Sequence, residues 1–145
     1  MRGLIQRVTS ASVAVDGEIK GAIDQGLLLL LGIEKGDSRG NADKMLAKLL
    51  AYRVFADAQA RMNLSVSDIN GGVLAISQFT LAADTRKGLR PGFSSAAPPA
   101  EAESLYNYFV EQLTAAHPTV ATGIFGADMR VSLVNDGPVT FLLET

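Results

Sequence analysis

The sequence contains no cysteine and a single histidine, His117. Without cysteine, the chain cannot form a disulfide bond, a thiolate nucleophile or a cysteine-ligated zinc site. One histidine cannot build a multi-histidine metal site, and it makes a serine-histidine-acid triad a poor candidate. No basic-then-apolar leader follows Met1, and no apolar run approaches the roughly 20 residues that a membrane-spanning helix needs. We therefore expect a cytoplasmic protein with no membrane partner.

An excess of positive charge is also missing. The chain has 13 lysines and arginines against 15 aspartates and glutamates, for a formal net charge of −2. Proteins that bind nucleic acids without regard to sequence are normally basic, because neutralisation of phosphates supplies their affinity. The composition therefore argues against a protein that coats DNA or RNA. A local pocket could still hold one end of a nucleic acid.

The chain has 145 residues, 48% of them apolar, and we expect residues 1–145 to form one domain. The leucine-rich run 27–31 lies between glycines and predicts a strand buried on both faces. Helical spacing predicts a helix at about 41–53, with Asn41 as N-cap, and a second at about 100–116. The other runs typical of strands are residues 4–8, 12–15, 19–23, 73–81, 120–125, 129–134 and 139–143. With a tight hairpin at Asp16-Gly17, this order indicates an α/β fold with a mixed sheet and a closing β meander.

The stretch Ser77-Gln78-Phe79-Thr80-Leu81 is polar for its place directly after an apolar run. Ser77 and Gln78 could donate hydrogen bonds to a ligand carbonyl or ribose, or could satisfy neighbouring backbone groups. Phe79 could stack on a base or fill the core. Thr80 as a nucleophile would need a base, and the neighbouring sequence offers none. Taken singly, none of these residues favours a catalytic or binding role over a structural one.

The stretch 135–140 brackets a Gly137-Pro138 bond with Asn135 and Thr140. Asp136-Gly137 between two apolar runs is ordinary hairpin sequence. Proline, however, lacks an N–H and restricts the residue before it, and an X-Pro bond is the place where a cis peptide is within about 1 kcal/mol of trans. A rigid cis turn could direct main-chain carbonyls at a ligand. The hairpin and the ligand-facing interpretation both stay open.

Residues 82–99 form a long irregular segment, and a loop of this length in a compact domain is usually functional. The segment carries Arg86, Lys87 and Arg90, which either face solvent or contact a phosphate. His117, at the end of the second expected helix, is best interpreted as a favourable C-terminal charge when protonated.

Read together, the two polar stretches resemble the D-aminoacyl-tRNA deacylase (D-tyrosyl-tRNA deacylase) family. The resemblance runs the whole length of the chain, through residues 4–8, the leucine-rich run ending at Gly32, 77–81, Arg90-Pro91-Gly92-Phe93, 105–109, 123–129 and 135–140. One departure is Gly92, where this family more often has serine. The resemblance implies a single α/β domain with a mixed, mainly antiparallel, barrel-like sheet and two main helices. It also implies a homodimer without metal or organic cofactor, and as partner the 3′ end of an aminoacylated tRNA.

The implied reaction is hydrolysis of the ester bond between a D-amino acid, or glycine, and tRNA. The resemblance assigns catalysis to Ser77, Gln78, Phe79 and Thr80, and substrate binding to Arg7, Phe93, Phe125, Ala127, Met129, Asn135, Gly137 and Pro138. Core packing is a rival role for Phe125, Ala127 and Met129. In the family the Gly137-Pro138 bond is cis, lies across the dimer interface from the Ser77–Leu81 stretch, and excludes L side chains. Arg7, Arg86 and Lys87 are implied cationic contacts to the tRNA.

Two family mechanisms remain for Thr80. In the first, its hydroxyl is the nucleophile that forms an acyl-enzyme, and in the second, its hydroxyl does not attack the ester. In the second mechanism the ribose 2′-hydroxyl assists the attack of water, and the backbone N–H groups around Phe79 and Thr80 form an oxyanion hole. We favour the second, because no neighbouring base could activate Thr80. Two rival functions are a non-catalytic binder of aminoacyl-tRNA ends and a general hydrolase of small esters.

Overall fold

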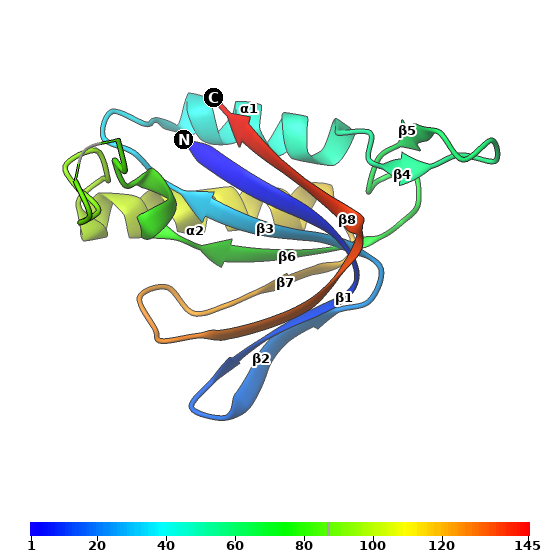
Figure 1. Cartoon of the computed structure of the whole chain (residues 1–145), viewed down its shortest axis with the longest axis horizontal. Coiled ribbons are helices and arrows are strands. Elements are labelled where there is room, and N and C mark those ends of the chain that lie inside the picture. Colours follow the sequence, from blue (N-terminus) through cyan, green and yellow to red (C-terminus); the bar gives the residue numbers. More distant parts are fainter. Residues whose placement is uncertain (87) are drawn as a thin grey trace.

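The computed structural model describes residues 1–86 and 88–145 as one mixed sheet with two helices on it (Figure 1). The strands follow the order β2 (Glu18–Ile23), β1 (Arg2–Val15), β3 (Gly26–Gly32), β6 (Gly72–Ser77) and β7 (Val120–Thr122), while β8 (Arg130–Glu144) pairs with the other side of β1. The remaining elements are the helices α1 (Arg39–Ala51) and α2 (Pro99–Ala116), the 3-10 helix η1 (Phe79–Ala82), and the small sheet of β4 (Phe55–Ala56) and β5 (Met62–Leu64).

The sheet is a nearly closed barrel. β1 runs antiparallel to β2, β3 and β8, whereas the pairs β3–β6 and β6–β7 are parallel. The outer strands approach each other, since a Cβ on Gly21 of β2 would lie 2.7 Å from the carbonyl oxygen of Thr122 in β7. The expected mixed, mainly antiparallel, barrel-like sheet with two main helices is thus confirmed.

The leucine-rich strand β3 lies at the centre of the core, as predicted. Its odd-numbered leucines pack with the apolar stripes of α1 and α2, including Met45, Leu49 and Phe109. Leu28 faces the other way, into a second cluster with Leu74 and Ile76 of β6. Leu27, Leu28 and Leu29 are at most 1% exposed. Neither α1 nor α2 is long and apolar enough to cross a membrane, nor is any other helix in the described ranges.

Several predicted element boundaries are wrong. Residues 4–8 and 12–15 belong to one strand, β1, and residues 129–134 and 139–143 belong to β8. No meander closes the sheet, because α2 carries the chain across so that β7 runs parallel to β6, and β8 returns to pair with β1. β6 ends at Ser77 instead of continuing to Leu81. The Gln78 N–H makes the last bond to β3, at the Leu31 carbonyl, and the Leu81 N–H then donates to the Gln78 carbonyl in the first turn of η1.

The first helix starts earlier than predicted, with Ser38 as N-cap instead of Asn41. The Asn41 side chain reaches back and accepts the Ser38 backbone N–H at 3.0 Å. Asn41 therefore belongs to the capping arrangement as its third helical residue, which explains why its sequence signal misplaced the helix start. The predicted Asp16-Gly17 hairpin is confirmed, with both residues at positive φ.

Candidate active site

The carboxyl end of β6 opens into a cavity of about 440 Å³. Ser77, Gln78 and Phe79 line one side of it. The opposite walls come from the loop between β7 and β8 and from the start of α2, and include Phe125, Gly126, Ala127, Met129, Pro99 and Ala102. β6 and β7 are parallel neighbours, so the segments after them meet at one edge of the sheet. The fold thus brings six of the predicted site residues around one cavity.

Two further predicted residues lie beside this cavity. The rings of Phe79 and Phe93 contact each other at 5.3 Å between centroids, although the side chains are 59% and 43% exposed. Thr80 is exposed, and its Oγ1 accepts a hydrogen bond of 2.6 Å from Gln78 Nε2. This amide is the only side-chain partner of the Thr80 hydroxyl within residues 1–86 and 88–145. No histidine, lysine or carboxylate contacts it there.

The first two N–H groups of η1 are free of backbone partners. Leu81 N–H is the first of this helix to bond, with the Gln78 carbonyl at 3.2 Å. The N–H groups of Phe79 and Thr80 precede it and have no i−3 carbonyl available. In the described part of the chain no other acceptor takes them. Two unbonded backbone N–H groups therefore follow Gln78, and one of them belongs to the cavity-lining residue Phe79.

The second predicted stretch forms a bulge in β8. Gln6 of β1 pairs with Thr140 and Val8 with Asn135, so the four residues 136–139 of β8 lie opposite the single residue Arg7 of β1. The chain passes through this bulge without reversing, so the hairpin interpretation is wrong. The Gly137-Pro138 peptide bond is cis, and Gly137 has a φ of +136°.

Asn135 and Arg7 hold the bulge from two sides. Asn135 Oδ1 accepts the Val139 N–H at 2.8 Å, and its Nδ2 donates to Thr140 Oγ1 at 3.0 Å. Arg7 Nε donates to the Asp136 carbonyl at 2.9 Å, and Nη1 donates to the carbonyl of Val54, at the base of the β4–β5 hairpin, at 2.6 Å. The Gly137-Pro138 backbone is consequently fixed and exposed.

Within one chain the two stretches do not meet. Ser77 pairs with Leu31, which pairs with Gly3, whereas Gly137 lies level with Arg7 on the far side of β1. Three steps of about 4.8 Å across the sheet and about four residues of 3.3 Å along it give a separation of roughly 20 Å. Figure 1 accordingly has η1 at the left end of the sheet and the bend of β8 at the right.

The charged residues of the long loop are partly paired. Arg86 Nε and Nη2 donate to the two carboxylate oxygens of Asp84 at 2.9 and 2.8 Å. These bonds, together with the Arg86 backbone N–H, hold the pKa of Asp84 well below its usual range. Arg90 is exposed, and Lys87 lies outside the described residues. His117 is buried with Nε2 2.7 Å from the Gly71 carbonyl, at the opposite end of β6 from the cavity.

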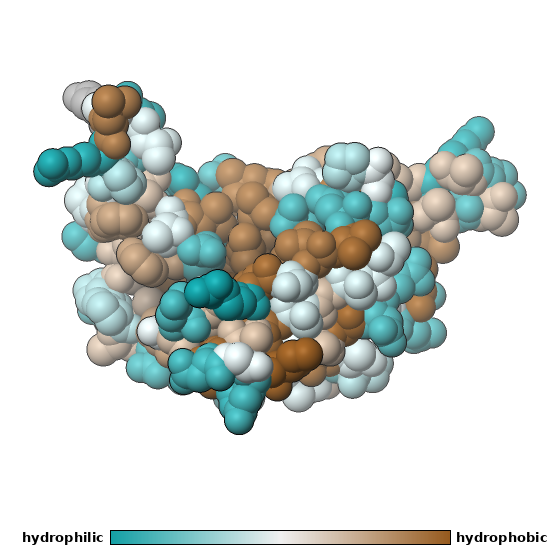
Figure 2. Space-filling model, turned by 60° about the horizontal axis from the view of Figure 1, so that its bottom comes forward, coloured by the Kyte–Doolittle hydropathy of each residue, from teal (hydrophilic) through white to brown (hydrophobic). Residues whose placement is uncertain are grey.

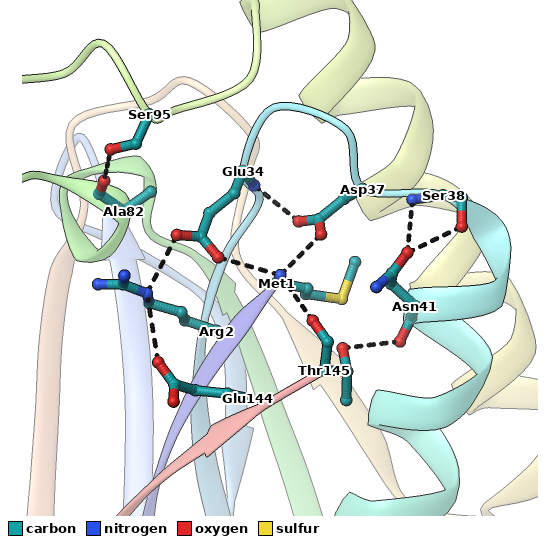
Figure 3. Close-up of polar contacts among 10 residues, drawn as sticks. All are labelled: Met1, Arg2, Glu34, Asp37, Ser38, Asn41, Ala82, Ser95, Glu144 and Thr145. Carbon is teal, nitrogen blue, oxygen red and sulfur yellow. Dashed lines mark hydrogen bonds and ion pairs between the residues drawn. The ribbon is translucent and has the colours of Figure 1, made fainter.

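A polar cluster at the chain termini holds the loop next to η1, and the sequence analysis missed it (Figure 3). The Met1 α-amino group donates to Glu34 Oε2 at 3.1 Å and to Asp37 Oδ1 at 2.7 Å. Lys35 N–H then bonds to the Ser95 carbonyl, and Ser95 Oγ donates to the carbonyl of Ala82 in η1. Such long-range pairs leave no local pattern in the sequence. No cluster of metal-binding side chains occurs in residues 1–86 and 88–145.

Comparisons with known proteins agree along the whole chain. A family model described as D-Tyr-tRNA(Tyr) deacylase matches residues 4–144. A protein named D-aminoacyl-tRNA deacylase from Cellvibrio japonicus is 67% identical over 144 residues, which are 99% of each chain. Another protein of that name, from Stutzerimonas stutzeri, is 65% identical over 145 residues, which are 100% of both.

Two solved structures have the same fold. A c-Myc DNA Unwinding Element Binding Protein superimposes with a TM-score of 0.96 at 42% identity, and the match covers 100% of this chain and 99% of that one. A probable eukaryotic D-amino acid tRNA deacylase superimposes with a TM-score of 0.84 at 14% identity, covering 99% of this chain and 98% of that one. At that identity the second likeness concerns the fold alone.

Proposed function

The chain belongs to the D-Tyr-tRNA(Tyr) deacylase family, and on that premise we propose that it hydrolyses the ester bond between a D-amino acid and tRNA. It is an ester hydrolase, a D-aminoacyl-tRNA deacylase, which releases free tRNA and the free D-amino acid. The observation that carries the proposal is the 440 Å³ cavity beside Ser77, Gln78 and Phe79, in a chain matched over residues 4–144.

The 3′-terminal adenosine of the substrate binds in this cavity. Phe125, Ala127 and Met129 supply an apolar wall for the base, and the exposed pair of Phe79 and Phe93 offers further aromatic surface at the entrance. One terminal nucleotide needs only a few contacts, so the net charge of −2 is compatible with a tRNA substrate. The cavity therefore binds one end of the nucleic acid without a basic face.

Water attacks the ester carbonyl carbon, assisted by the ribose 2′-hydroxyl of the substrate. The N–H groups of Phe79 and Thr80 stabilise the negative charge that develops on the carbonyl oxygen. The tetrahedral intermediate then expels the ribose 3′-oxygen, which takes up the proton that the attacking water has lost. Among residues 1–86 and 88–145 no base makes a hydrogen bond to the Thr80 hydroxyl, which supports this route over an acyl-enzyme.

Discrimination between D- and L-amino acids comes from the Gly137-Pro138 backbone of a second copy of the chain. A second copy is required because the two stretches lie roughly 20 Å apart within one chain. Carbonyls of the turn bind the substrate α-amino group, and an L side chain collides with the backbone, which cannot rotate away. A D side chain points outward and is not selected, and glycine has no side chain to exclude.

The free edge of β8 supports a homodimer. β8 is 15 residues long and, among the described residues, pairs only with β1, so its other edge is open to a partner. Val134 and Leu142 on this strand are 57% and 51% exposed. Figure 2 shows hydrophobic residues exposed across the middle of the lower face, bordered by hydrophilic ones. Apolar surface of this kind is typical of an interface between subunits.

The test is hydrolysis of D-tyrosyl-tRNA and L-tyrosyl-tRNA by the purified protein without added metal. We expect rapid loss of the D ester and none of the L ester above the uncatalysed rate. Loss of both esters would keep the hydrolase and exclude the backbone gate. Loss of neither, by folded dimeric protein, would favour a non-catalytic binder of tRNA ends. Equal rates on a D-tyrosyl ester without tRNA would favour a general hydrolase of small esters.

A further inference from the structure

A second cavity, of about 390 Å³, lies directly beyond η1. Its lining is mainly polar and comes from three separate parts of the chain: Arg2 at the start of β1, residues 83–86 after η1, and Ser94 and Ser95 before α2. The first cavity ends at Phe79 on the other side of η1. η1 itself has four residues, a length of roughly 8 Å at about 2 Å per residue, and it connects Phe79 of the first cavity to the segment that lines the second.

The guanidinium group of Arg2 is held from one side only. Its Nε lies 3.1 Å from Glu34 Oε1 and 3.6 Å from Glu144 Oε1. Figure 3 shows the two terminal nitrogens of Arg2 pointing away from both carboxylates. Within the described residues these two nitrogens have no hydrogen-bond acceptor. Arg2 therefore presents two fixed donors and a positive charge to the cavity.

The carboxylate in this cavity is already engaged. Both oxygens of Asp84 accept hydrogen bonds from Arg86, and one of them also accepts the Arg86 backbone N–H at 3.0 Å. The remaining hydrogen-bonding groups are the terminal nitrogens of Arg2 and Nη1 of Arg86, which only donate, and the hydroxyl groups of Thr85 and Ser94, which can donate as well as accept. A set of donors with two guanidinium groups fits an oxyanion and not a cation.

We propose that this second cavity binds the phosphodiester on the 5′ side of the terminal adenosine. The inference rests on the proposed function, in which the nucleoside itself occupies the first cavity. The separation across η1 is one that a single nucleotide spans, so base and phosphate reach both cavities at once. Arg2 and Ser94 position the 3′ end of the tRNA, and neither contacts the ester that is broken.

The test compares two small substrates that differ only in the phosphate: 3′-O-D-tyrosyl-adenosine and its 5′-monophosphate. We expect the wild-type protein to prefer the monophosphate about tenfold in kcat/KM, through KM, because a charge-assisted hydrogen bond is worth that factor. Arg2→Gln should lose this preference and keep the wild-type rate on the unphosphorylated substrate. Arg53→Gln removes an exposed arginine outside both cavities and should keep the preference.

Ser94→Ala provides a milder variant that leaves the ion pairs of Arg2 intact, and we expect it to reduce the preference about threefold. If the wild-type protein hydrolyses both substrates equally well, or if Arg2→Gln and Ser94→Ala retain the preference, the phosphate site is excluded while the deacylase activity stands. If the wild-type protein hydrolyses neither substrate nor D-tyrosyl-tRNA, the proposed function fails and the phosphate site fails with it.

Discussion

At the scale of single residues, Thr80 carries two groups that could take part in catalysis, its side-chain hydroxyl and its backbone N–H. Its hydroxyl accepts a hydrogen bond from Gln78, and in the described part of the chain no basic side chain is positioned to take its proton. The backbone N–H of the same residue, at the start of η1, is free to bind the developing oxyanion. In the proposed mechanism Thr80 therefore acts through its backbone N–H and not through its hydroxyl.

Thr80→Ala is accordingly expected to keep kcat/KM for D-tyrosyl-tRNA within about tenfold of the wild-type value, since the alanine retains the N–H. A nucleophile would instead lose several orders of magnitude. The measurement is single-turnover hydrolysis with enzyme in excess. A folded Thr80→Ala protein without activity would establish the acyl-enzyme route.

Gly137→Ala is expected to lower kcat/KM for the D ester by about 100-fold, because a small displacement of the bulge misplaces the substrate. A Cβ at this position would lie 2.7 Å from Val139 Cγ2 and 3.1 Å from Arg7 Nη2, at a φ of +136° that side chains avoid. Gly17→Ala is the matched control, with positive φ in an open turn away from both stretches, and should keep full activity. Unchanged rate and selectivity in Gly137→Ala would refute the gate.

Residues that are close in sequence were the ones that sequence analysis found. Ser77, Gln78 and Phe79 follow one another after an apolar run, so their shared position was predictable. Arg2 gave no signal, because its place in the second cavity depends on β1 lying between β3 and β8. The same holds for the cluster of Met1 with Glu34 and Asp37, because Met1 is more than 30 residues away from both of its acidic partners.

At the scale of elements, the strands were predicted better than their connections. The leucine-rich strand was predictable because its continuous apolar run lies within a few neighbouring residues, and the prediction that it is buried on both faces is confirmed. The division of β8 into two strands was wrong because a proline in a strand usually marks its end, whereas here a bulge between Asn135 and Thr140 accommodates it. Strand partners were the least predictable feature, since the parallel β6–β7 pair depends on the packing of α2.

The contact between α2 and β6 makes stability sensitive to alkaline pH. Tyr106 donates its hydroxyl to the Ala75 carbonyl at 2.9 Å, and burial raises the pKa of Tyr106 to about 12 from the ordinary 10.0. The folded state thus holds this proton more tightly than the unfolded chain. The resulting contribution to stability is complete below pH 10 and is lost as the pH rises from about 10 to 12.

Tyr106→Phe is expected to lower the free energy of unfolding at pH 7 by about 1 kcal/mol, through the lost hydrogen bond. Between pH 10 and 12 it should show a smaller fall in stability than the wild-type protein. Denaturant unfolding over this pH range measures both effects. Tyr52→Phe retains the ring that packs on Phe141 and serves as the control. An equally steep alkaline fall in Tyr106→Phe would assign the effect to another group.

At the scale of the whole molecule, η1 and the Gly137-Pro138 bulge lie at opposite ends of the sheet of one chain (Figure 1). The two segments are separated because β6 pairs with β3 whereas β8 pairs with β1, so β1 and β3 lie between them in the sheet. The proposed site uses both ends, so it would be complete only in a symmetric pair, where each end faces the other end of its partner. Activity should therefore belong to the dimer and not to the single chain.

Mixing two inactive variants tests this directly. Ala127→Trp fills the first cavity with a large ring, and Gly137→Ala displaces the bulge, so each homodimer is inactive. After unfolding and refolding together at equal amounts, half of the dimers contain both chains, and each of these has one intact site of two. We therefore expect recovery of about a quarter of the wild-type activity.

The control carries both substitutions in one chain. Refolded with an equal amount of wild-type chain, this double variant contributes no intact site to a mixed dimer, so activity comes only from wild-type homodimers. If the site were complete within one chain, Ala127→Trp and Gly137→Ala would fail to complement each other, and the double-variant mixture would retain half of the activity instead of about a quarter. The two mixtures together decide whether selection by the Gly137-Pro138 backbone acts between chains.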